Sequence, residues 1–155
     1  SIDIAAEQAW LSAVRLIVWQ YPVQGYGMPA LMKLWLDEVF AFGWAYGPGG
    51  TALQGKPLWP VLSTGGTAES YGPAGYNRHP IEHFLLPLQQ TAALTGLCLL
   101  PPHVIHGAHR LDDRQIAAEA ETYRDRLQRF PAWAPSPTMA AGDCRVPADA
   151  RPHSL

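Results

Sequence analysis

Short apolar runs alternate with helical patterns along the first 130 residues, and this alternation limits the possible folds more than any other feature of the chain. We expect helices over residues 4–13, 29–41, 80–95 and 112–130, and strands over residues 15–20, 58–63 and 97–106. Strands that alternate with helices are joined by right-handed crossovers and form a mainly parallel sheet. The pattern therefore predicts an α/β fold, a doubly wound parallel sheet with helices on both faces.

The length and composition fit one domain with an apolar core. The chain has 155 residues, of which 48% are hydrophobic and 15% are charged, enough apolar material for a single core. Residues 131–155 are rich in proline and alanine and show no periodicity. We expect residues 1–130 to form the domain and residues 131–155 to be a disordered tail.

Charge and apolar patterning exclude several classes of protein. Eleven basic and thirteen acidic residues give a net charge of -2, so no broad cationic field is present to bind nucleic acid. Apolar windows such as residues 92–100 are too short to span a bilayer. From the residues given, we expect no export signal. Cys98 lies in an apolar run and Cys144 in the proline-rich segment. We therefore expect no structural disulfide and a cytoplasmic location.

An aromatic and glycine-rich loop follows the first predicted strand. The apolar run 16–19 leads into residues 21–27, and a helical pattern begins at Pro29. In open α/β sheets, ligands bind at the carboxyl ends of the strands. The loop is therefore the first candidate binding site.

A second polar loop follows the strand at 58–63. It contains Ser63, Thr64, Gly65 and Gly66 and continues to Gly72. Paired glycines allow backbone N–H groups to approach a planar ligand closely, and the two hydroxyl groups add polar contacts. Taken alone, this segment is more typical of a tight turn between a strand and a helix than of a binding loop, and both interpretations stay open.

Metal and hydrolase sites have weaker support. His103, His106 and His109 cannot converge on one ion from an extended strand, because the first two face opposite sides and the outer two are roughly 20 Å apart. His79 and His83 form an incomplete ligand set for zinc. No Gly-x-Ser-x-Gly motif is present to mark a nucleophile. We expect no metal site and interpret these histidines as structural or solvated.

Several segments together resemble a known enzyme family. They are Pro22-Val23-Gln24-Gly25-Tyr26, Lys33-Leu34-Trp35-Leu36-Asp37, Gly43-Trp44-Ala45-Tyr46-Gly47, Gly55-Lys56 and Ser63-Thr64-Gly65-Gly66. In this order and spacing the chain resembles the flavodoxin-like NAD(P)H:quinone oxidoreductases over residues 1–130. It is most similar to the bacterial ancillary oxidoreductases of glutathione-regulated potassium-efflux systems, on the further segments 2–8 and 49–53.

The resemblance implies a flavin bound between the two loops. Val23, Gln24, Gly25 and Tyr26 would contact the isoalloxazine ring, and Ser63, Thr64, Gly65 and Gly66 would lie along its polar edge. The cofactor would be FMN or, as an alternative, FAD. The implied reaction is a ping-pong cycle in which NAD(P)H reduces the flavin and a quinone then takes two electrons.

Catalytic side chains are also implied by the resemblance. Tyr71 stands where a more distant relative has a site tyrosine, and Tyr76 or His79 lies in the segment that holds its site histidine. These residues would donate hydrogen bonds to the quinone or stabilise charge on the reduced ring.

The resemblance further implies partners. The enzyme would be a homodimer, with residues 29–41 and the aromatic loop 42–46 as a plausible interface. A second possibility is a regulatory subunit docked on the cytoplasmic face of a potassium-efflux antiporter at the inner membrane.

Two features depart from the family pattern. Gly25 stands where members usually have tryptophan. About forty residues, the size of one strand–helix–strand unit, would precede Ser1 and carry the phosphate-binding loop. We therefore expect the chain to be truncated at its amino end, and an inactive fragment is a third possibility.

Overall fold

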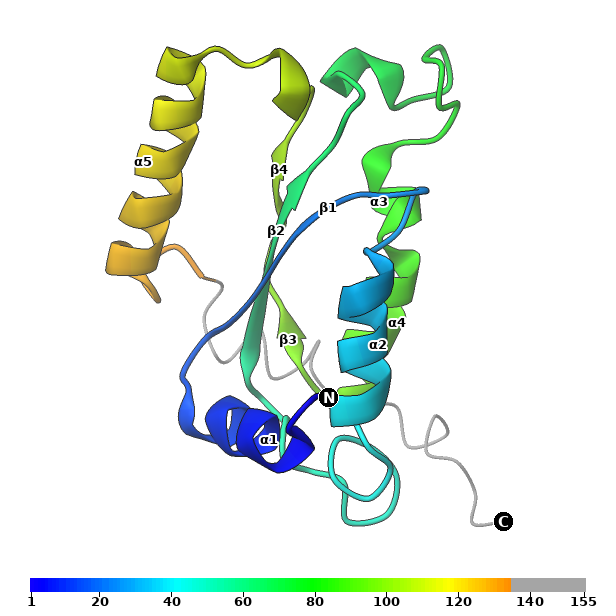
Figure 1. Ribbon diagram of the computed structural model, residues 1–155, viewed down its shortest axis with the longest axis vertical. Helices are drawn as coiled ribbons and strands as arrows, with labels where there is room; N and C mark the ends of the chain where they lie inside the picture. The colour runs from blue at the N-terminus through cyan, green and yellow to red at the C-terminus, as the bar shows by residue number, and fades with distance from the viewer. Residues whose placement is uncertain (135–155) are drawn as a thin grey trace.

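The computed structural model describes residues 1–134, and its elements follow the predicted order of helices and strands (Figure 1). The helices are α1 (Ile4–Ala13), α2 (Ala30–Val39), α3 (Ile81–Phe84), α4 (Leu86–Thr95) and α5 (Asp113–Arg129). The strands are β1 (Ile17–Pro22), β2 (Pro57–Ser63), β3 (Cys98–Leu99) and β4 (His103–Ile105), and two 3₁₀ helices are η1 (Ala68–Ser70) and η2 (Ala108–Arg110).

The sheet is entirely parallel, as the sequence predicted. β2 lies between β1 on one edge and both β3 and β4 on the other. Figure 1 shows α5 on one side of the sheet and α2, α3 and α4 on the other, so helices cover both faces. Within residues 1–134, the second edge of β1 pairs with no strand.

Prolines divide two of the predicted elements. The helix predicted over 80–95 is broken at Leu85 into α3 and α4, because Pro87 has no N–H to donate to the preceding turn. The strand predicted over 97–106 is interrupted by Pro101 and Pro102 into β3 and β4, since proline cannot donate to a sheet ladder.

Side chains of alternating direction along the strands build two clusters. Ile17, Trp19 and Tyr21 of β1 pack with α2 and α4 in the larger cluster. Trp59 and Val61 of β2 point to the opposite face. There the Trp59 ring contacts Tyr123 of α5, with centroids 5.4 Å apart. Because β2 is buried on both faces, the ends of β2 are held firmly in place.

The fold continues a few residues beyond α5. The Trp133 ring packs against Trp59 with centroids 5.1 Å apart, and its Nε1 donates a hydrogen bond of 2.7 Å to the Arg126 carbonyl. Trp133 and Ala134 of the predicted tail therefore pack against the core, and residues 135–155 lie outside the described residues.

The structure bears on the expectations about membrane-spanning segments and about the cysteines. Among the described helices, none is both long and apolar enough to cross a membrane. Cys98 is buried and disulfide-bonded. The expectation of no structural disulfide is therefore wrong, because a cysteine in an apolar strand gives no indication in sequence of what lies beside it.

Candidate functional site

The two predicted loops lie side by side. β1 and β2 are parallel neighbours whose last paired residues are Pro22 and Ser63, so the segments that follow them leave the same edge of the sheet. The Val23 N–H donates a hydrogen bond of 2.8 Å to the Ser63 carbonyl and joins the two loops directly.

The first loop is a tight turn closed by two backbone hydrogen bonds. Gln24 and Gly27 each donate an N–H to the other's carbonyl, at 2.9 and 3.0 Å. Gly25 and Tyr26 both have positive φ angles, of 54° and 64°, as expected for the central residues of a type I′ turn. A left-handed conformation costs about 1 kcal/mol for a residue other than glycine, so Tyr26 needs contacts that hold it there.

The Tyr26 side chain makes those contacts with a distant segment. Its hydroxyl donates a hydrogen bond of 3.1 Å to Asn77 Oδ1, and its ring stacks on Phe84 with centroids 5.0 Å apart. Asn77 Nδ2 in turn donates to Ser70 Oγ. The first loop is thereby attached to the segment 70–84.

Both loops present backbone donors that have no acceptor within residues 1–134. The N–H groups of Gly25, Tyr26, Gly65, Gly66 and Thr67 donate to no residue that the structure describes. A Cβ atom built on Gly65 would find its nearest neighbours, two atoms of the His109 ring, at 3.9 Å. This combination of open space and unpaired donors suits a flat ligand that carries acceptor atoms along one edge.

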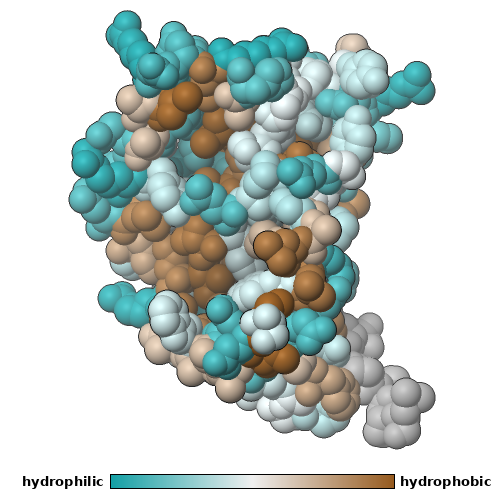
Figure 2. Space-filling view, in the orientation of Figure 1, coloured by the Kyte–Doolittle hydropathy of each residue, from teal (hydrophilic) through white to brown (hydrophobic). Residues whose placement is uncertain are grey.

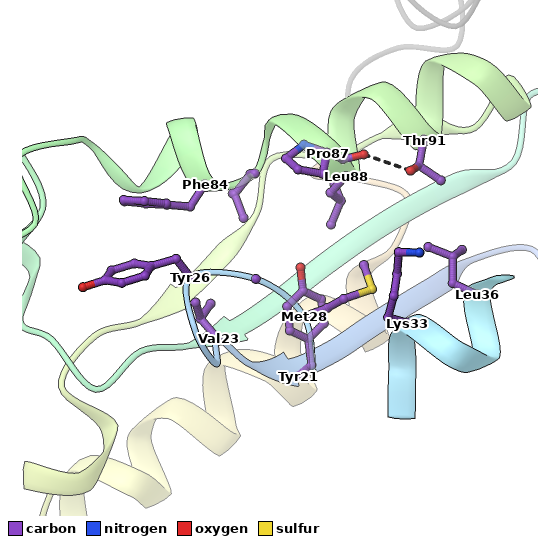
Figure 3. A pocket seen from close by; sticks show the side chains of 12 residues that line it. Tyr21, Val23, Tyr26, Met28, Lys33, Leu36, Phe84, Pro87, Leu88 and Thr91 are labelled. Carbon is purple, nitrogen blue, oxygen red and sulfur yellow. Dashed lines mark hydrogen bonds between the residues drawn. The ribbon is translucent and has the colours of Figure 1, made fainter. Parts of the chain in front are cut away.

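A polar cavity of about 400 Å³ lies between these segments. Its lining residues are Tyr26, Gly66, Thr67, Ser70, Tyr71, Tyr76, Asn77 and Arg110. An apolar cavity of about 280 Å³ opens on the other side of Tyr26, between α2 and α4. In Figure 3, Tyr26 and Phe84 lie at one end of the apolar cavity, and Tyr21, Met28 and Leu88 point into it.

The structure gathers some of the predicted site residues and separates others. Tyr26, Gly66, Tyr71 and Tyr76 line the polar cavity. Val23 lines the apolar cavity, and His79 lines neither. Gln24, Gly25, Ser63, Thr64 and Gly65 belong to the two loops but line neither cavity.

The three predicted catalytic residues have different surroundings. Tyr71 is partly buried and its ring contacts Phe84 and His106, with centroids 5.9 and 5.4 Å apart. Tyr76 is 88% exposed. His79 is exposed and lies against His83 and Phe84. Of the three, Tyr71 has the most defined position.

His103, the first residue of β4, and His106, the residue after this strand, have separate polar partners. His103 Nε2 lies 2.9 Å from Glu119 Oε2 of α5, on one face of the sheet. His106 Nδ1 lies 3.0 Å from Thr64 Oγ1 in the second loop. Within the described residues, no group of three metal-ligating side chains converges on one point.

Four residues at the site were missed by sequence reasoning: Asn77, Phe84, His106 and Arg110. Asn77 lies in an irregular segment, which carries no periodic signal, and Phe84 lies in the short helix α3 that follows this segment. His106 follows β4, a neighbour of β2, so the rule that ligands bind beyond strand ends could have indicated it.

Burial and hydrogen bonding shift three pKa values around the site. Tyr21 lines the apolar cavity. Burial raises the pKa of Tyr21 to about 12, so its hydroxyl stays protonated. Loss of solvent around His106 lowers its pKa, against the opposing effect of Glu69 and Glu82. Hydrogen bonds from its own backbone N–H and from Thr67 lower the pKa of Glu69.

Comparison with known proteins now identifies the family. The model of a family described by its flavodoxin-like fold matches residues 1–127. The chain belongs to this flavodoxin-like family. The predicted fold class is confirmed, and the site of this flavodoxin-like protein lies at the strand ends where the fold places its ligands.

Several relatives of this flavodoxin-like protein have names that describe their roles. The glutathione-regulated potassium-efflux system ancillary protein KefF of Klebsiella pneumoniae (strain 342) is 44% identical over 127 residues, which are 82% of this chain and 71% of the relative. The general stress protein 14 of Treponema denticola, solved in complex with FMN, is 34% identical with a TM-score of 0.69, over 86% of this chain and 72% of that one.

Two further solved structures carry different activities in their names. An NADPH-quinone reductase of P. pentosaceus is 28% identical with a TM-score of 0.70, over 76% of this chain and 72% of that one. A thermophilic tryptophan halogenase of Streptomycin violaceusniger is 38% identical with a TM-score of 0.78, over 82% of this chain and 74% of that one. Because similar folds carry different names, the function of this flavodoxin-like protein has to be argued from its site.

Proposed function

We propose that the chain is a flavin-dependent NAD(P)H dehydrogenase (quinone). The observation that carries the proposal is the pair of adjoining loops, whose N–H groups at Gly25, Tyr26 and 65–67 have no acceptor among the described residues. Three of these residues, Tyr26, Gly66 and Thr67, line a cavity that also has Tyr71 and Tyr76 in its wall. The relatives named for NADPH-quinone reduction and for an FMN complex support the same function.

The residues of both loops fit a flavin ring. Val23, Gln24, Gly25 and Tyr26 would hold one side of the ring, and Ser63, Thr64, Gly65 and Gly66 its polar edge. When bound, a flavin accepts a hydride from NAD(P)H and delivers two electrons to a quinone. We propose FMN as the cofactor, with FAD as the alternative, because the solved relative named for a flavin complex contains FMN.

Nicotinamide and quinone would use the polar cavity in turn, which gives the ping-pong order. Tyr26 stacks one face of its ring on Phe84 and is half exposed, so the other face would be available to a flat ligand. Tyr71, fixed between Phe84 and His106, would direct its phenolic O–H at the quinone oxygen and supply a proton or a hydrogen bond there.

Substitution of the three candidate catalytic residues should separate their roles. Tyr71→Phe is expected to lower kcat for a quinone at least about tenfold. Of the three side chains, Tyr71 has the most defined position, and this substitution removes its hydroxyl group. Tyr76→Phe should have a smaller effect because Tyr76 is almost fully exposed, and His79→Asn should have none because His79 lines neither cavity. Steady-state kinetics at saturating NADPH measures all three. Equal loss in all three variants would contradict this order.

The first experiment on the proposed function is an absorbance spectrum of the purified chain after incubation with FMN, or separately with FAD, and removal of free cofactor. Bound flavin gives bands at about 370 and 450 nm. Retention of these bands together with NADPH oxidation in the presence of a quinone would support the proposal. Failure to retain either FMN or FAD would exclude it and favour an inactive fragment.

Gly65→Ala is expected to lower FMN affinity by at least about tenfold, the effect of losing roughly 1.4 kcal/mol of binding energy. The added methyl group has space in the protein itself, so the melting temperature should stay close to that of the wild type. It would, however, occupy the surface that the ring needs. Fluorescence quenching of FMN measures the dissociation constant.

Gly27→Ala is the matched control for Gly65→Ala. A Cβ on Gly27 also meets nothing within 4 Å, and Gly27 lines the apolar cavity rather than the polar one. It should leave both stability and FMN affinity unchanged. Equal FMN affinity in Gly65→Ala and the wild type would argue against a ring placed on this turn.

A homodimer is the assembly that we propose. α2 exposes Leu31 at 75% and Leu34 at 50%, and the aromatic loop exposes Phe42 at 65%. Figure 2 shows apolar residues, in brown, on this face of the molecule over α2 and toward β1. Burial of such a surface against a second copy would remove it from water. Sedimentation at micromolar concentration tests the proposal, and a single monomeric species would contradict it.

The name of the KefF relative favours a second candidate role, as an ancillary subunit of a potassium-efflux system. In that role the chain would lie in the cytoplasm, peripheral to the cytoplasmic face of the inner membrane. This role is compatible with catalysis. Potassium efflux from vesicles that contain the transporter, measured with and without the chain, tests it, and unchanged efflux and absence of binding would exclude it.

A further inference from the structure

The hydroxyl group of Thr64 lies between two polar neighbours in the second loop. Thr64 is 2% exposed. Its Oγ1 lies 2.8 Å from the Gly66 carbonyl oxygen and 3.0 Å from His106 Nδ1. Both distances are those of hydrogen bonds.

The number of available protons fixes the direction of both hydrogen bonds. A carbonyl oxygen can only accept, so the single hydroxyl proton of Thr64 goes to Gly66. Thr64 Oγ1 has no second proton to offer, and His106 Nδ1 must therefore carry a proton and donate it to Oγ1. This direction requires either the charged imidazolium or the neutral tautomer with its proton on Nδ1, because Nδ1 is a donor in both of these forms.

Backbone hydrogen bonds hold the same turn against the segment after β4. The Thr64 N–H donates to the Ile105 carbonyl at 2.9 Å, the Ala108 N–H to the Thr64 carbonyl at 2.9 Å, and the Gly107 N–H to the Gly66 carbonyl at 2.8 Å. The Gly66 carbonyl thus accepts from both the Thr64 hydroxyl and Gly107. These two hydrogen bonds hold the Gly66 carbonyl toward the segment after β4.

Because the peptide bond is planar, fixing the direction of a carbonyl group also fixes the direction of the N–H group that follows it. In a trans peptide unit the C=O and the following N–H point in opposite directions, and the one cis peptide bond in the described residues is Phe130–Pro131. With the carbonyls of Thr64 and Gly66 held toward the segment 105–108, the N–H groups of Gly65 and Thr67 point away from it. Both N–H groups lack an acceptor among the described residues, and Thr67 lines the polar cavity.

We propose that His106 is a positioning residue that aims the backbone donors of the 64–67 turn at the bound cofactor, by donating its Nδ1 proton to Thr64 Oγ1. The inference rests on the proposed flavin function for the identity of the ligand, while the hydrogen-bond arrangement itself does not. Glu69, Glu82 and the Tyr71 ring also face the imidazole, but none of them competes for Nδ1 with a hydrogen bond in the described residues.

Two variants of His106 distinguish the effect of its hydrogen bond from the effect of its side-chain volume. His106→Asn keeps an N–H donor at about the position of Nδ1, whereas His106→Leu fills similar space without a donor. FMN affinity should fall about tenfold in His106→Leu and should stay within about threefold of the wild type in His106→Asn. Thr64→Val should match His106→Leu. Equal affinities for the Leu and Asn variants, whether both weak or both normal, would overturn the proposal.

Two measurements on the flavin-free chain keep the inference separate from the proposed function. Nitrogen-15 NMR of the imidazole should show the proton on Nδ1 of His106, and amide hydrogen exchange at Gly107 should be faster in His106→Leu than in wild type or His106→Asn. A proton on Nε2 alone, or unchanged exchange in His106→Leu, would overturn the positioning role. If the wild-type chain binds no flavin while these two results hold, the proposed function fails and the turn is held for a different ligand.

Discussion

Trp59→Ala should destabilise the fold by about 3–5 kcal/mol, a large part of the roughly 5–15 kcal/mol that holds a domain together. Trp59 is fully buried in the middle of β2. Its ring packs against Tyr123 of α5 and Trp133 beyond it. Removing the indole would leave a cavity between the sheet and α5, where no neighbour can move in without breaking another contact. Urea unfolding at 25 °C, followed by circular dichroism, measures the change in the free energy of unfolding.

Trp59→Phe is the matched control, because it keeps an aromatic ring against Tyr123 and Trp133. It also removes the buried Trp59 Nε1–H, which has no hydrogen-bond partner in the described structure. An unpaired buried donor is itself destabilising by about 1–3 kcal/mol, so the loss of packing and the removal of this donor partly offset each other. We expect Trp59→Phe to lose less than about half of the stability that Trp59→Ala loses. A Phe variant as unstable as the Ala variant would show that ring volume is not what matters here.

Gly50→Ala should cost about 3 kcal/mol, the second large effect. A Cβ on Gly50 would collide with the backbone of Tyr46, including its nitrogen at 2.6 Å. Backbone atoms cannot rotate aside as a flexible side chain can. The turn that joins Gly47 to Gly50 through a 3.0 Å hydrogen bond would have to open.

Gly49→Ala, at the neighbouring position, distinguishes the effect of a steric clash from the effect of an unfavourable φ angle. Gly49 has a φ of 76°, and a Cβ there would meet nothing within 4 Å. Its substitution should cost only about 1 kcal/mol, the conformational penalty of a left-handed residue. Thermal and urea unfolding of both variants tests the difference. Similar losses in the two variants would mean that the loop relaxes around the Gly50 methyl group.

The Gly50 prediction also bears on assembly. The turn supports Trp44 and Tyr46, which pack against the main core, and its neighbour Phe42 is exposed. If α2 and this aromatic loop form the proposed dimer interface, Gly50→Ala should weaken association as well as folding. Gly49→Ala should affect association much less.

Much of the fold could be predicted from local sequence. Asp3 caps α1 by accepting a hydrogen bond from the Ala6 N–H, and Asp112 with Gln115 forms a capping box at the start of α5. These signals lie within three residues of the helix start, so the sequence contains them complete. The strands were predicted from apolar runs, and the parallel sheet followed from their alternation with helices.

The two site loops were also predicted from sequence, for a simple geometric reason. Each follows the carboxyl end of a parallel strand, and neighbouring parallel strands end at the same edge of a sheet. Tyr26, Gly66, Tyr71 and Tyr76 do border one cavity. Whether they bind a flavin stays a prediction, tested by the spectrum of the purified chain.

The amino-acid sequence by itself determined the order of the elements, the parallel sheet and the edge at which the loops meet, because these depend on short-range periodicity and chain connectivity. The tertiary structure alone decided the partners across that edge: Asn77 for Tyr26, and His106 for Thr64. These pairs are separated by 51 and 42 residues. Their contact depends on where the irregular segments lie in the folded chain. It also depends on which polar atoms can donate and accept hydrogen bonds once solvent is excluded.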